Sequence, residues 1–514
     1  MLIVGSGPGG ALLAHSLAGS GLDVVILEAG PPVGVDDFRD DIGSTISQWF
    51  WEGGMRTTRG NVLMPTLQGR VLGGGSVFNS AICMRATPTA LNHWAEAHGL
   101  GQLADGRLDE HYAAIENFLG IRRVEAAVQG RRNELFREGC ENLGWSVEAM
   151  PRAEQGCTGS ARCMLGCRSD AKQSVDKRPI ASHLRAGGRV FTSVQVDQVL
   201  FDGTRARGVS GHAIDPDTHV KTHPVRITAD TVVISGGAIN TPRILRASGV
   251  TDPAVGDNLR FHPSCFVVGV FDEEVNPWNG ATQGYQTLDF QDQGIKIESL
   301  WGTPGVIAMR FPTSGKQFKR TLAKYPRTAV FDAWISNDGS KGRVGSLPGD
   351  RADIVWDLGV ADVRRLQEAN ALVAELFASS GATQVMHGIH GLPEVMDPLE
   401  AAYEIRKAEL KPGDLPTGSN HVYGTMAMGD NPRTHGTDVD GRVHGRESLY
   451  VCDTSLFPES PGVNPQHTAM ALARRMAAHL IERAPRATGT HLQARPADKV
   501  KGNPMIRLVS QDAG

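Results

Sequence analysis

Hydrophobic residues at the start of the chain form short continuous runs, separated by a glycine-rich turn and a longer periodic stretch. Residues 1–4 predict a strand, residues 8–20 a helix, and residues 22–30 (LDVVILEAG) a second buried strand. A strand, a glycine turn, a helix and a strand in this order are typical of a βαβ unit. The opening therefore predicts a doubly wound parallel sheet in an α/β fold.

The rest of the chain contains both helix-type and strand-type hydrophobic patterns. Helical patterns within residues 91–150 each end at a glycine, and residues 188–214 predict strands around an Asp-Gly turn. Residues 229–249 predict a strand that runs through glycines into a helix, and residues 465–483 predict a long helix. Residues 263–418 mix strand and helix patterns without a glycine motif. Because nucleotide-type segments lie at both ends of the chain, one domain must be discontinuous in sequence.

Composition and charge narrow the class of protein. The chain has 514 residues, and its 52 basic and 56 acidic side chains leave a net charge of −4. That length is enough for two or three domains with a large core. Nucleic acids and anionic membranes usually require a basic excess, so neither is an expected partner. No window reaches the roughly 18 uncharged apolar residues of a membrane-spanning helix.

The number of cysteines and the N-terminal sequence indicate the cellular compartment in which the protein is expected. Seven cysteines in a chain of this length do not indicate a disulfide framework, so a reducing compartment is the default. Met1 begins the first predicted strand, and we therefore expect no signal peptide. These observations predict a cytoplasmic protein and leave its oligomeric state open.

The glycine turn at the N-terminus indicates a dinucleotide site. Gly5, Gly7 and Gly10 follow a predicted strand and open a predicted helix, where backbone N–H groups can approach a pyrophosphate. Glu28 ends the second strand, 18 positions after Gly10, where a carboxylate would accept hydrogen bonds from an adenosine ribose. An ordinary tight turn with a surface glutamate is the alternative. The pattern itself does not distinguish FAD from NAD.

Four later segments identify a family by resemblance. They are GRVLGGGSVFNSAICMR, GGAINTPRILRASGV, VGDNLRFHP and the C-terminal stretch that contains HVYGTMAMG and VDGRVHGRESLYVCDTSLFPESPGVNPQHTAMALA. In this order they resemble the glucose–methanol–choline (GMC) family of FAD-dependent oxidoreductases. The motifs are most similar to those of long-chain-alcohol oxidases and cholesterol oxidases. The resemblance implies FAD as cofactor and oxidation of an alcohol to a carbonyl.

The resemblance also implies two domains. One is a Rossmann-like FAD-binding domain with a central parallel sheet, and the other is a substrate domain on an antiparallel sheet with helices. The expected boundaries are 1–90, 185–262 and 420–485 for the discontinuous FAD-binding domain, 91–184 for a helical, cysteine-containing segment, 263–419 for the substrate domain, and 486–514 for a C-terminal tail.

Alcohol oxidation needs a base for the hydroxyl proton and an acceptor for a hydride. Histidine suits the first task because its pKa lies near neutrality, and the resemblance assigns that role to His421. It assigns Asn464, 43 positions later, to the group that hydrogen-bonds the substrate oxygen. His467 follows on the next helix and His262 lies in the RFHP segment; we expect both to be structural.

The same resemblance also implies which residues contact the cofactor. Asn79 is expected beside the flavin, and the preceding residue is Phe78 where some relatives have a histidine bonded covalently to flavin, so we expect non-covalent FAD. Ala427 departs from the arginine frequent in the family's GTxRMG motif. The other expected contacts are Arg70, Gly74 and Ser76 along pyrophosphate and flavin, Asp453 at the ribityl–pyrophosphate region, the Val196 backbone at adenine, Gly236 at its ribose, and Pro465 and Thr468 in the N-P-x-x-T frame of Asn464.

A cluster of three cysteines indicates a second cofactor as an alternative. Cys157, Cys163 and Cys167 stand in a C-x5-C-x3-C pattern, and three thiolates could ligate an iron–sulfur cluster. Sugar dehydrogenase subunits of the family have a similar stretch that holds a three-iron cluster. Here Arg168 replaces the proline that follows their third cysteine, and a fourth thiolate is not evident. Buried free thiols are therefore favoured, with the cluster as an alternative.

The substrate is the least determined feature. The motif similarities favour a fairly apolar alcohol, with a sugar or polyol as the alternative. The electron acceptor, O₂ or another molecule, is not specified by the sequence. Two other classes stay open: an NAD-dependent dehydrogenase, which would lack flavin colour, and a flavin-binding electron-transfer protein without alcohol chemistry.

Overall fold

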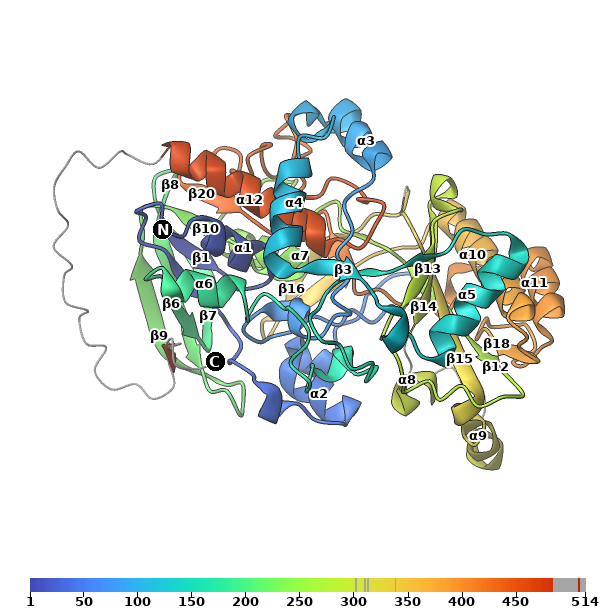
Figure 1. Ribbon diagram of the computed structural model, residues 1–514. Helices are drawn as coiled ribbons and strands as arrows, with labels where there is room; N and C mark the ends of the chain where they lie inside the picture. The colour runs from blue at the N-terminus through green and yellow to red at the C-terminus, as the bar shows by residue number, and fades with distance from the viewer. Residues whose placement is uncertain (301–302, 309–310, 312–313, 338, 484–506, 509–514) are drawn as a thin grey trace.

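A largely parallel sheet, built from segments near both ends of the chain, forms one half of the architecture. The computed structural model describes residues 1–300, 303–308, 311, 314–337, 339–483 and 507–508 (Figure 1). The first sheet has the order β20-β10-β1-β2-β6-β21. Its strands are β1 (Leu2–Val4), β2 (Val25–Leu27), β6 (Arg189–Thr192), β10 (Val232–Ile234), β20 (Leu449–Val451) and β21 (Arg507–Leu508). All are parallel to their neighbours except β21, which is antiparallel to β6.

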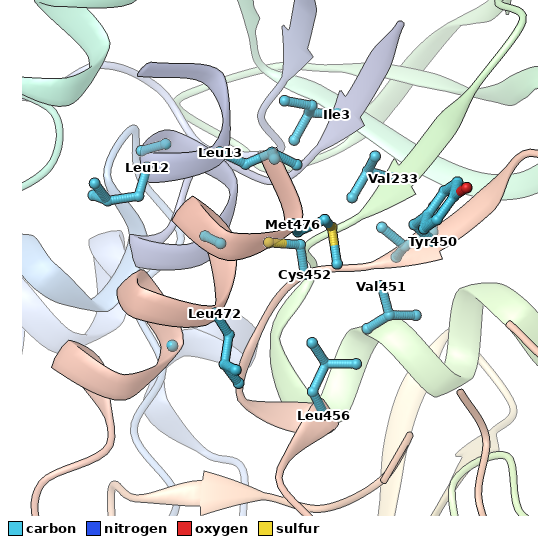
Figure 2. Close-up of a cluster of buried hydrophobic side chains, with 14 of the residues drawn as sticks. Ile3, Leu12, Leu13, Val233, Tyr450, Val451, Cys452, Leu456, Leu472 and Met476 are labelled. Carbon is cyan, nitrogen blue, oxygen red and sulfur yellow. The ribbon is translucent and has the colours of Figure 1, made fainter. Parts of the chain in front are cut away.

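Short apolar strands suit a sheet that is covered on both faces. The strands LIV, VVI and LYV are buried throughout. Helix α1 (Pro8–Ser16) packs against the long helix α12 (Gln466–Arg483) beside the sheet. Figure 2 shows Leu12 and Leu13 of α1 and Leu472 and Met476 of α12 in one cluster with the strand residue Val233. The chain ends are therefore joined through this core.

An antiparallel sheet forms the other half, in the order β18-β12-β15-β14-β13-β4. Its strands are β4 (Glu148–Ala149), β12 (Ser264–Val270), β13 (Tyr285–Thr287), β14 (Ile295–Leu300), β15 (Thr328–Ile335) and β18 (Gln384–Met386). Helices α5 (Arg131–Leu143), α10 (Val360–Ser379) and α11 (Pro398–Lys407) lie at this end of the molecule (Figure 1). The expected combination of a parallel and an antiparallel sheet is confirmed.

Alternation along β14 and β15 separates a helix-facing side from a cavity-facing side. Phe331 of β15 stacks on Phe377 of α10 at 4.1 Å and meets Phe136 of α5 edge-on at 5.1 Å. The next position, Asp332, lies in the wall of a cavity instead, and so does Trp334. This two-residue period lets one sheet contribute both to the core and to the site.

The remaining helices and strands lie outside these two sheets, and the strands form smaller sheets. The helices are α2 (Ile42–Trp49), α3 (Pro88–His98), α4 (Asp109–Leu119), α6 (Pro179–Arg185), α7 (Gly237–Ala247), α8 (Pro304–Ala308) and α9 (Gly315–Leu322). The strands are β3 (Ile121–Arg123), β5 (Pro151–Ala153), β7 (Val194–Asp202), β8 (Arg205–Ile214), β9 (Lys221–Thr228), β11 (Arg260–Phe261), β16 (Arg343–Leu347), β17 (Arg351–Val355) and β19 (Val422–Tyr423). The expected C-terminal tail, 486–514, lies outside the described residues apart from 507–508. Within the described ranges, no helix is both long enough and apolar enough to cross a membrane.

Candidate active site

The three glycines of the N-terminal turn have different surroundings. Gly5 has φ +101°, and a Cβ there would lie 2.2 Å from the carbonyl oxygen of Ser235. A Cβ on Gly10 would lie 2.1 Å from the carbonyl oxygen of Gly5. A Cβ on Gly7 would meet no atom within 4 Å. Close packing thus requires glycine at positions 5 and 10, whereas position 7 faces open space at the start of α1.

The carboxylate of Glu28 is integrated into the same turn. It accepts hydrogen bonds from the backbone N–H and the hydroxyl of Ser6, at 3.0 and 2.7 Å, and from the backbone N–H of Gly30 at 2.8 Å. Burial raises the pKa of Glu28, and these hydrogen bonds oppose that shift. Glu28 therefore shapes the turn and also lines the cavity beside it.

Arg70 presents a buried cation with unused donors. Its side chain lies over the ring of Trp51, at 5.5 Å from the ring centre. Within the described part of the chain, Nε and Nη2 of Arg70 have no hydrogen-bond partner. Burial lowers the pKa of Arg70, and the negative charge of Glu28 opposes that shift. Buried guanidinium donors are normally paired, so this arrangement fits a bound anionic group such as a pyrophosphate.

One cavity of about 570 Å³ extends from the glycine turn to the expected catalytic residues. This volume is in the range of small-molecule and cofactor sites. The expected site residues that line it are Gly5, Gly7, Glu28, Gly74, Ser76, Asn79, Val196, Gly236, Asp453, Pro465, His421 and Asn464. Residues from positions 5 to 465 thus converge on a single space.

Three expected cofactor residues stand behind the lining. Gly10 packs its backbone against Gly5. Arg70 is buried next to the lining residue Gly69. The hydroxyl of Thr468 accepts a hydrogen bond from the hydroxyl of Tyr112 at 3.0 Å, inside the protein. Gly10 and Thr468 therefore support the walls of the cavity from behind.

Asp453 links two segments of the cavity wall that are far apart in sequence. Its carboxylate accepts hydrogen bonds from the backbone N–H of Gly237 at 2.9 Å, from the hydroxyl of Thr241 at 2.6 Å, and from the backbone N–H of Ser455 at 2.8 Å. Burial raises the pKa of Asp453, and these donors oppose the shift. The carboxylate therefore fixes the start of α7 against the end of β20.

His421 and Asn464 meet at the other end of the cavity. Nδ2 of Asn464 lies 3.5 Å from Nε2 of His421. Burial lowers the pKa of His421 to about 4, a shift that the charge of Glu298 opposes and that of Lys296 reinforces. The imidazole is therefore neutral at physiological pH and able to accept a proton. At this separation Nε2 and Nδ2 can both form a hydrogen bond to one further atom that lies beside them.

Two buried charged residues at this end were missed by the sequence analysis. Nζ of Lys296 lies 2.8 Å from Oδ1 of Asn464 and 2.7 Å from Oε2 of Glu298. Nε2 of Gln283 donates to Oε1 of Glu298 at 2.6 Å. The available signal was the alternation in IKIESL, which places Lys296 and Glu298 on one face of β14. Charged residues in strands usually face solvent, so the alternation alone did not identify a site.

His262, for which we expect a structural role, lines the cavity next to His421. Its Nδ1 is 3.1 Å from Nδ1 of His421, and its Nε2 is 2.7 Å from the hydroxyl of Ser460. Its ring stacks on Trp334 at 4.4 Å. His467, also expected to be structural, lies away from the cavity lining and packs edge-on against Tyr112 at 4.8 Å.

The opposite end of the cavity contains a charged cluster that sequence reasoning also missed. Asp350 follows β16, and its carboxylate accepts from Lys221 at 3.0 Å, from Arg243 at 2.8 Å and from Gln195 at 3.0 Å. All four residues line the cavity. They come from separate segments, so no local pattern could have joined them. Val196, expected at adenine, lies beside them at a register shift in β7.

The cysteine stretch lies close to the cavity wall. Nη2 of Arg152 donates to Sγ of Cys163 at 3.2 Å, and Nζ of Lys172 donates to the Cys163 carbonyl at 2.9 Å. Burial opposes ionisation of Cys163, but Arg152 and Lys172 outweigh it and lower its pKa. Burial raises the pKa of Cys157 to about 11. Among the residues that the structure describes, no three His, Cys, Asp or Glu side chains are placed to hold a metal ion.

Comparisons with known proteins agree with this architecture. The family model described as GMC oxidoreductase matches residues 46–264 with its N-terminal part and residues 340–473 with its C-terminal part. A model for NAD(P)-binding Rossmann-like domains matches residues 3–49. The solved structure of pyridoxine 4-oxidase from Mesorbium loti has a TM-score of 0.70 at 16% identity, covering 94% of this chain and 99% of that chain. At that identity the likeness concerns the fold.

Sequence relatives carry the family assignment. An uncharacterized GMC-type oxidoreductase of Mycobacterium tuberculosis is 33% identical over 92% of this chain and 74% of its own length. A long-chain-alcohol oxidase of Arabidopsis thaliana is 26% identical over 92% of this chain and 66% of its own length. The resemblance seen in the sequence motifs is thereby confirmed, and the chain belongs to the GMC oxidoreductase family.

Proposed function

We propose that this protein oxidises an alcohol CH–OH group to a carbonyl, with FAD as the cofactor. The observation that carries the proposal is the single cavity that joins the glycine turn to His421 and Asn464. The residues that we propose for the dinucleotide and for the base therefore line one common space. Oxidation of an alcohol needs both in contact with the substrate.

His421 is the proposed base. Its depressed pKa keeps the imidazole neutral, so it can take the hydroxyl proton as the C–H bond breaks. Asn464 points its Nδ2 toward the same place and would hydrogen-bond the substrate oxygen as negative charge develops there. Bound FAD would supply the hydride acceptor. The step would release a carbonyl compound and leave the hydroxyl proton on Nε2 of His421, while the hydride would go to the bound cofactor.

The cofactor end fits FAD in chemistry and shape. Gly7 leaves open space at the N-terminus of α1, where backbone N–H groups favour a phosphate. The unused donors of Arg70 match a pyrophosphate, and Glu28 lines the position expected for a ribose. Phe78 lines the flavin end and carries no nucleophile, so we propose that FAD is held without a covalent bond through this position.

Two substrate classes are proposed. A fairly apolar alcohol follows from the motif similarity to long-chain-alcohol oxidases, and Leu300 and Trp334 in the cavity wall support it. A polar hydroxylic substrate such as a sugar or polyol is supported by Gln283, Glu298 and Asp332 in the same wall. The polar side chains favour a substrate with further hydrogen-bonding groups near the reacting carbon.

An anaerobic screen tests the function and the substrate together. Purified protein is mixed without O₂ with panels of long-chain alcohols, sterols, sugars and polyols, and bleaching of the flavin absorbance is followed. We expect a yellow protein, bleaching by at least one alcohol, and loss of bleaching in His421→Ala with FAD still bound. A colourless protein that reduces NAD would overturn the proposal. A yellow protein that no alcohol bleaches would favour an electron-transfer flavoprotein. Adding O₂ or a quinone to the bleached enzyme identifies the acceptor.

A further inference from the structure

Lys296 determines the orientation of the Asn464 amide. An ammonium group has three donors and no acceptor, so the atom of Asn464 that lies 2.8 Å from Nζ must be the carbonyl oxygen Oδ1. Burial lowers the pKa of Lys296, and the carboxylate of Glu298 opposes that shift and accepts a hydrogen bond from Nζ at 2.7 Å. The two side chains are almost fully buried and pair with each other. Trp334 presents its ring to the same ammonium group at 5.4 Å. The amide therefore directs Nδ2, a donor, toward His421.

This orientation determines which ring nitrogen of His421 carries the proton. Nδ2 of Asn464 points at Nε2 of His421 across 3.5 Å. Two donors cannot face each other, so Nε2 must keep its lone pair. The proton of the neutral imidazole then resides on Nδ1, which lies 3.1 Å from Nδ1 of His262.

The proton position on His421 in turn determines the proton position on His262. Because His421 donates from Nδ1, Nδ1 of His262 must accept and its proton must reside on Nε2. Nε2 of His262 donates to the hydroxyl of Ser460 at 2.7 Å. That hydroxyl also accepts from the backbone N–H of Gly462 at 3.0 Å and can donate to the hydroxyl of Ser336 at 3.1 Å. Each contact in the chain thus contains one donor and one acceptor.

We propose that Lys296 and His262 are positioning residues that hold His421 in its Nδ1–H tautomer, with Nε2 bare and directed at the substrate hydroxyl. This inference rests on the proposed function. If the amide of Asn464 were reversed, Oδ1 would accept from an Nε2–H tautomer, and the nitrogen that must take the substrate proton would already carry one. Lys296 excludes that arrangement because it has nothing to accept with. His262 stabilises the other side by accepting at Nδ1.

The tautomer can be measured directly. Holoenzyme labelled with ¹⁵N-histidine is examined by NMR without substrate, and the His421 signals are identified by their loss in His421→Asn. We expect a protonated Nδ1 and a bare Nε2. The double variant Lys296→Met/Glu298→Gln removes both members of the buried ion pair, and in it we expect a mixture of both tautomers. Lys172→Met removes a second buried lysine that bonds backbone carbonyls, and we expect the tautomer to be unchanged there.

Kinetics supply a second readout. We expect the double variant to lose about 10- to 100-fold in the anaerobic rate of flavin reduction, with FAD content retained. This loss is smaller than the roughly 100- to 10,000-fold of a complete general-base contribution, because His421 itself is still present. Lys296→Arg preserves the donor and should recover part of the rate. His262→Asn can present an acceptor near the position of Nδ1 and should remain faster than His262→Phe. If the Lys296 variants do not fold, the two His262 variants carry the same test.

Two outcomes would overturn the inference: a protonated Nε2 in the wild-type holoenzyme, or an unchanged tautomer in the double variant. Equal rates for His262→Asn and His262→Phe would remove His262 from its role. These failures are distinct from failure of the proposed function. An Nε2–H tautomer in an enzyme that alcohols do bleach refutes the positioning alone. A bare Nε2 in a protein that no alcohol bleaches refutes the alcohol chemistry alone.

Discussion

A methyl group on Gly10 would lie 2.1 Å from the carbonyl oxygen of Gly5, whereas one on Gly7 would enter open space. Two glycines of one motif are thus required by packing, and the third is free to change without a clash. The fold and the binding of a cofactor can therefore be separated by substitution at neighbouring positions.

We predict opposite phenotypes for Gly7→Ala and Gly10→Ala. Gly7→Ala should leave the stability of the apoprotein within about 0.5 kcal/mol but weaken FAD binding about tenfold or more, because the methyl occupies space that the pyrophosphate needs. Gly10→Ala should destabilise the apoprotein by about 1–3 kcal/mol through overpacking. Thermal melts of the apoproteins and flavin titrations distinguish the two. Equal FAD affinity in Gly7→Ala and wild type would remove the pyrophosphate from this turn.

Replacement of Arg70 should weaken FAD binding without lowering the thermal stability of the apoprotein. Its buried guanidinium has unused donors, so Arg70→Met removes a desolvated charge and should not lower the melting temperature of the apoprotein. The same change should weaken FAD binding about 10- to 100-fold, the value of one charge-assisted hydrogen bond. Fluorescence titration with FAD measures the affinity. An apoprotein that melts much lower with unchanged affinity would make Arg70 purely structural.

The pH profile of alcohol oxidation should reflect His421. Its pKa is lowered to about 4 by burial, and the base is active only when neutral. We therefore expect kcat/KM to stay level from neutral pH down to about pH 5 and to fall below it with loss of a single proton-accepting group. Flavin reduction rates measured at subsaturating alcohol give the profile. An inflection near the ordinary histidine value of about 6.5 would contradict the buried, neutral base.

Buried histidines should also make stability depend on pH. The pKa values of His421, His467 and His387 are each lowered to about 4, mainly by burial. Below the unfolded value of about 6.5 the unfolded chain binds more protons than the folded one. Stability is therefore fully present above that pH and is lost as the pH falls toward 4. Urea unfolding at several pH values measures the slope.

One substitution, at His387, tests whether buried histidines cause this loss of stability at acid pH. Nδ1 of His387 accepts a hydrogen bond from the backbone N–H of Ile389 at 3.0 Å, and an asparagine oxygen can replace it. His387→Asn should preserve the fold and make the acid-side slope shallower by one proton. A slope that does not change would mean that His387 does not contribute to acid destabilisation.

The cysteine stretch leads to an analytical prediction. Cys163 contacts Arg152, and the described residues contain no group of three ligands placed for a metal. We expect the purified flavoprotein to contain no iron in proportion to its flavin, by elemental analysis and by the absence of absorbance beyond the flavin bands. Stoichiometric iron that is lost in Cys157→Ser and Cys167→Ser would establish the iron–sulfur alternative instead.

Local sequence was sufficient to predict the N-terminal strands, the glycine turn and the helix that follows it. Residues 2–27 follow the predicted order of strand, turn, helix and strand, because short apolar runs and glycines determine local geometry. The resemblance placed His421 and Asn464 as a pair, and the structure brings their side chains to 3.5 Å. The predicted helix over 465–483 begins at Gln466. These features depend on residues close together in sequence or on motifs that are themselves continuous.

The sequence by itself thus determined the family, the two-sheet architecture and the glycine turn that we propose for a dinucleotide. Only the tertiary structure decided the neighbours of His421. Lys296 and Asn464 are 168 positions apart, and His262 and His421 are 159 apart. No periodicity or motif links such positions, because a buried charge in a strand has the same local pattern as an exposed one. Their pairing depends on how the antiparallel sheet closes over the cavity, and that closure is a property of the whole chain.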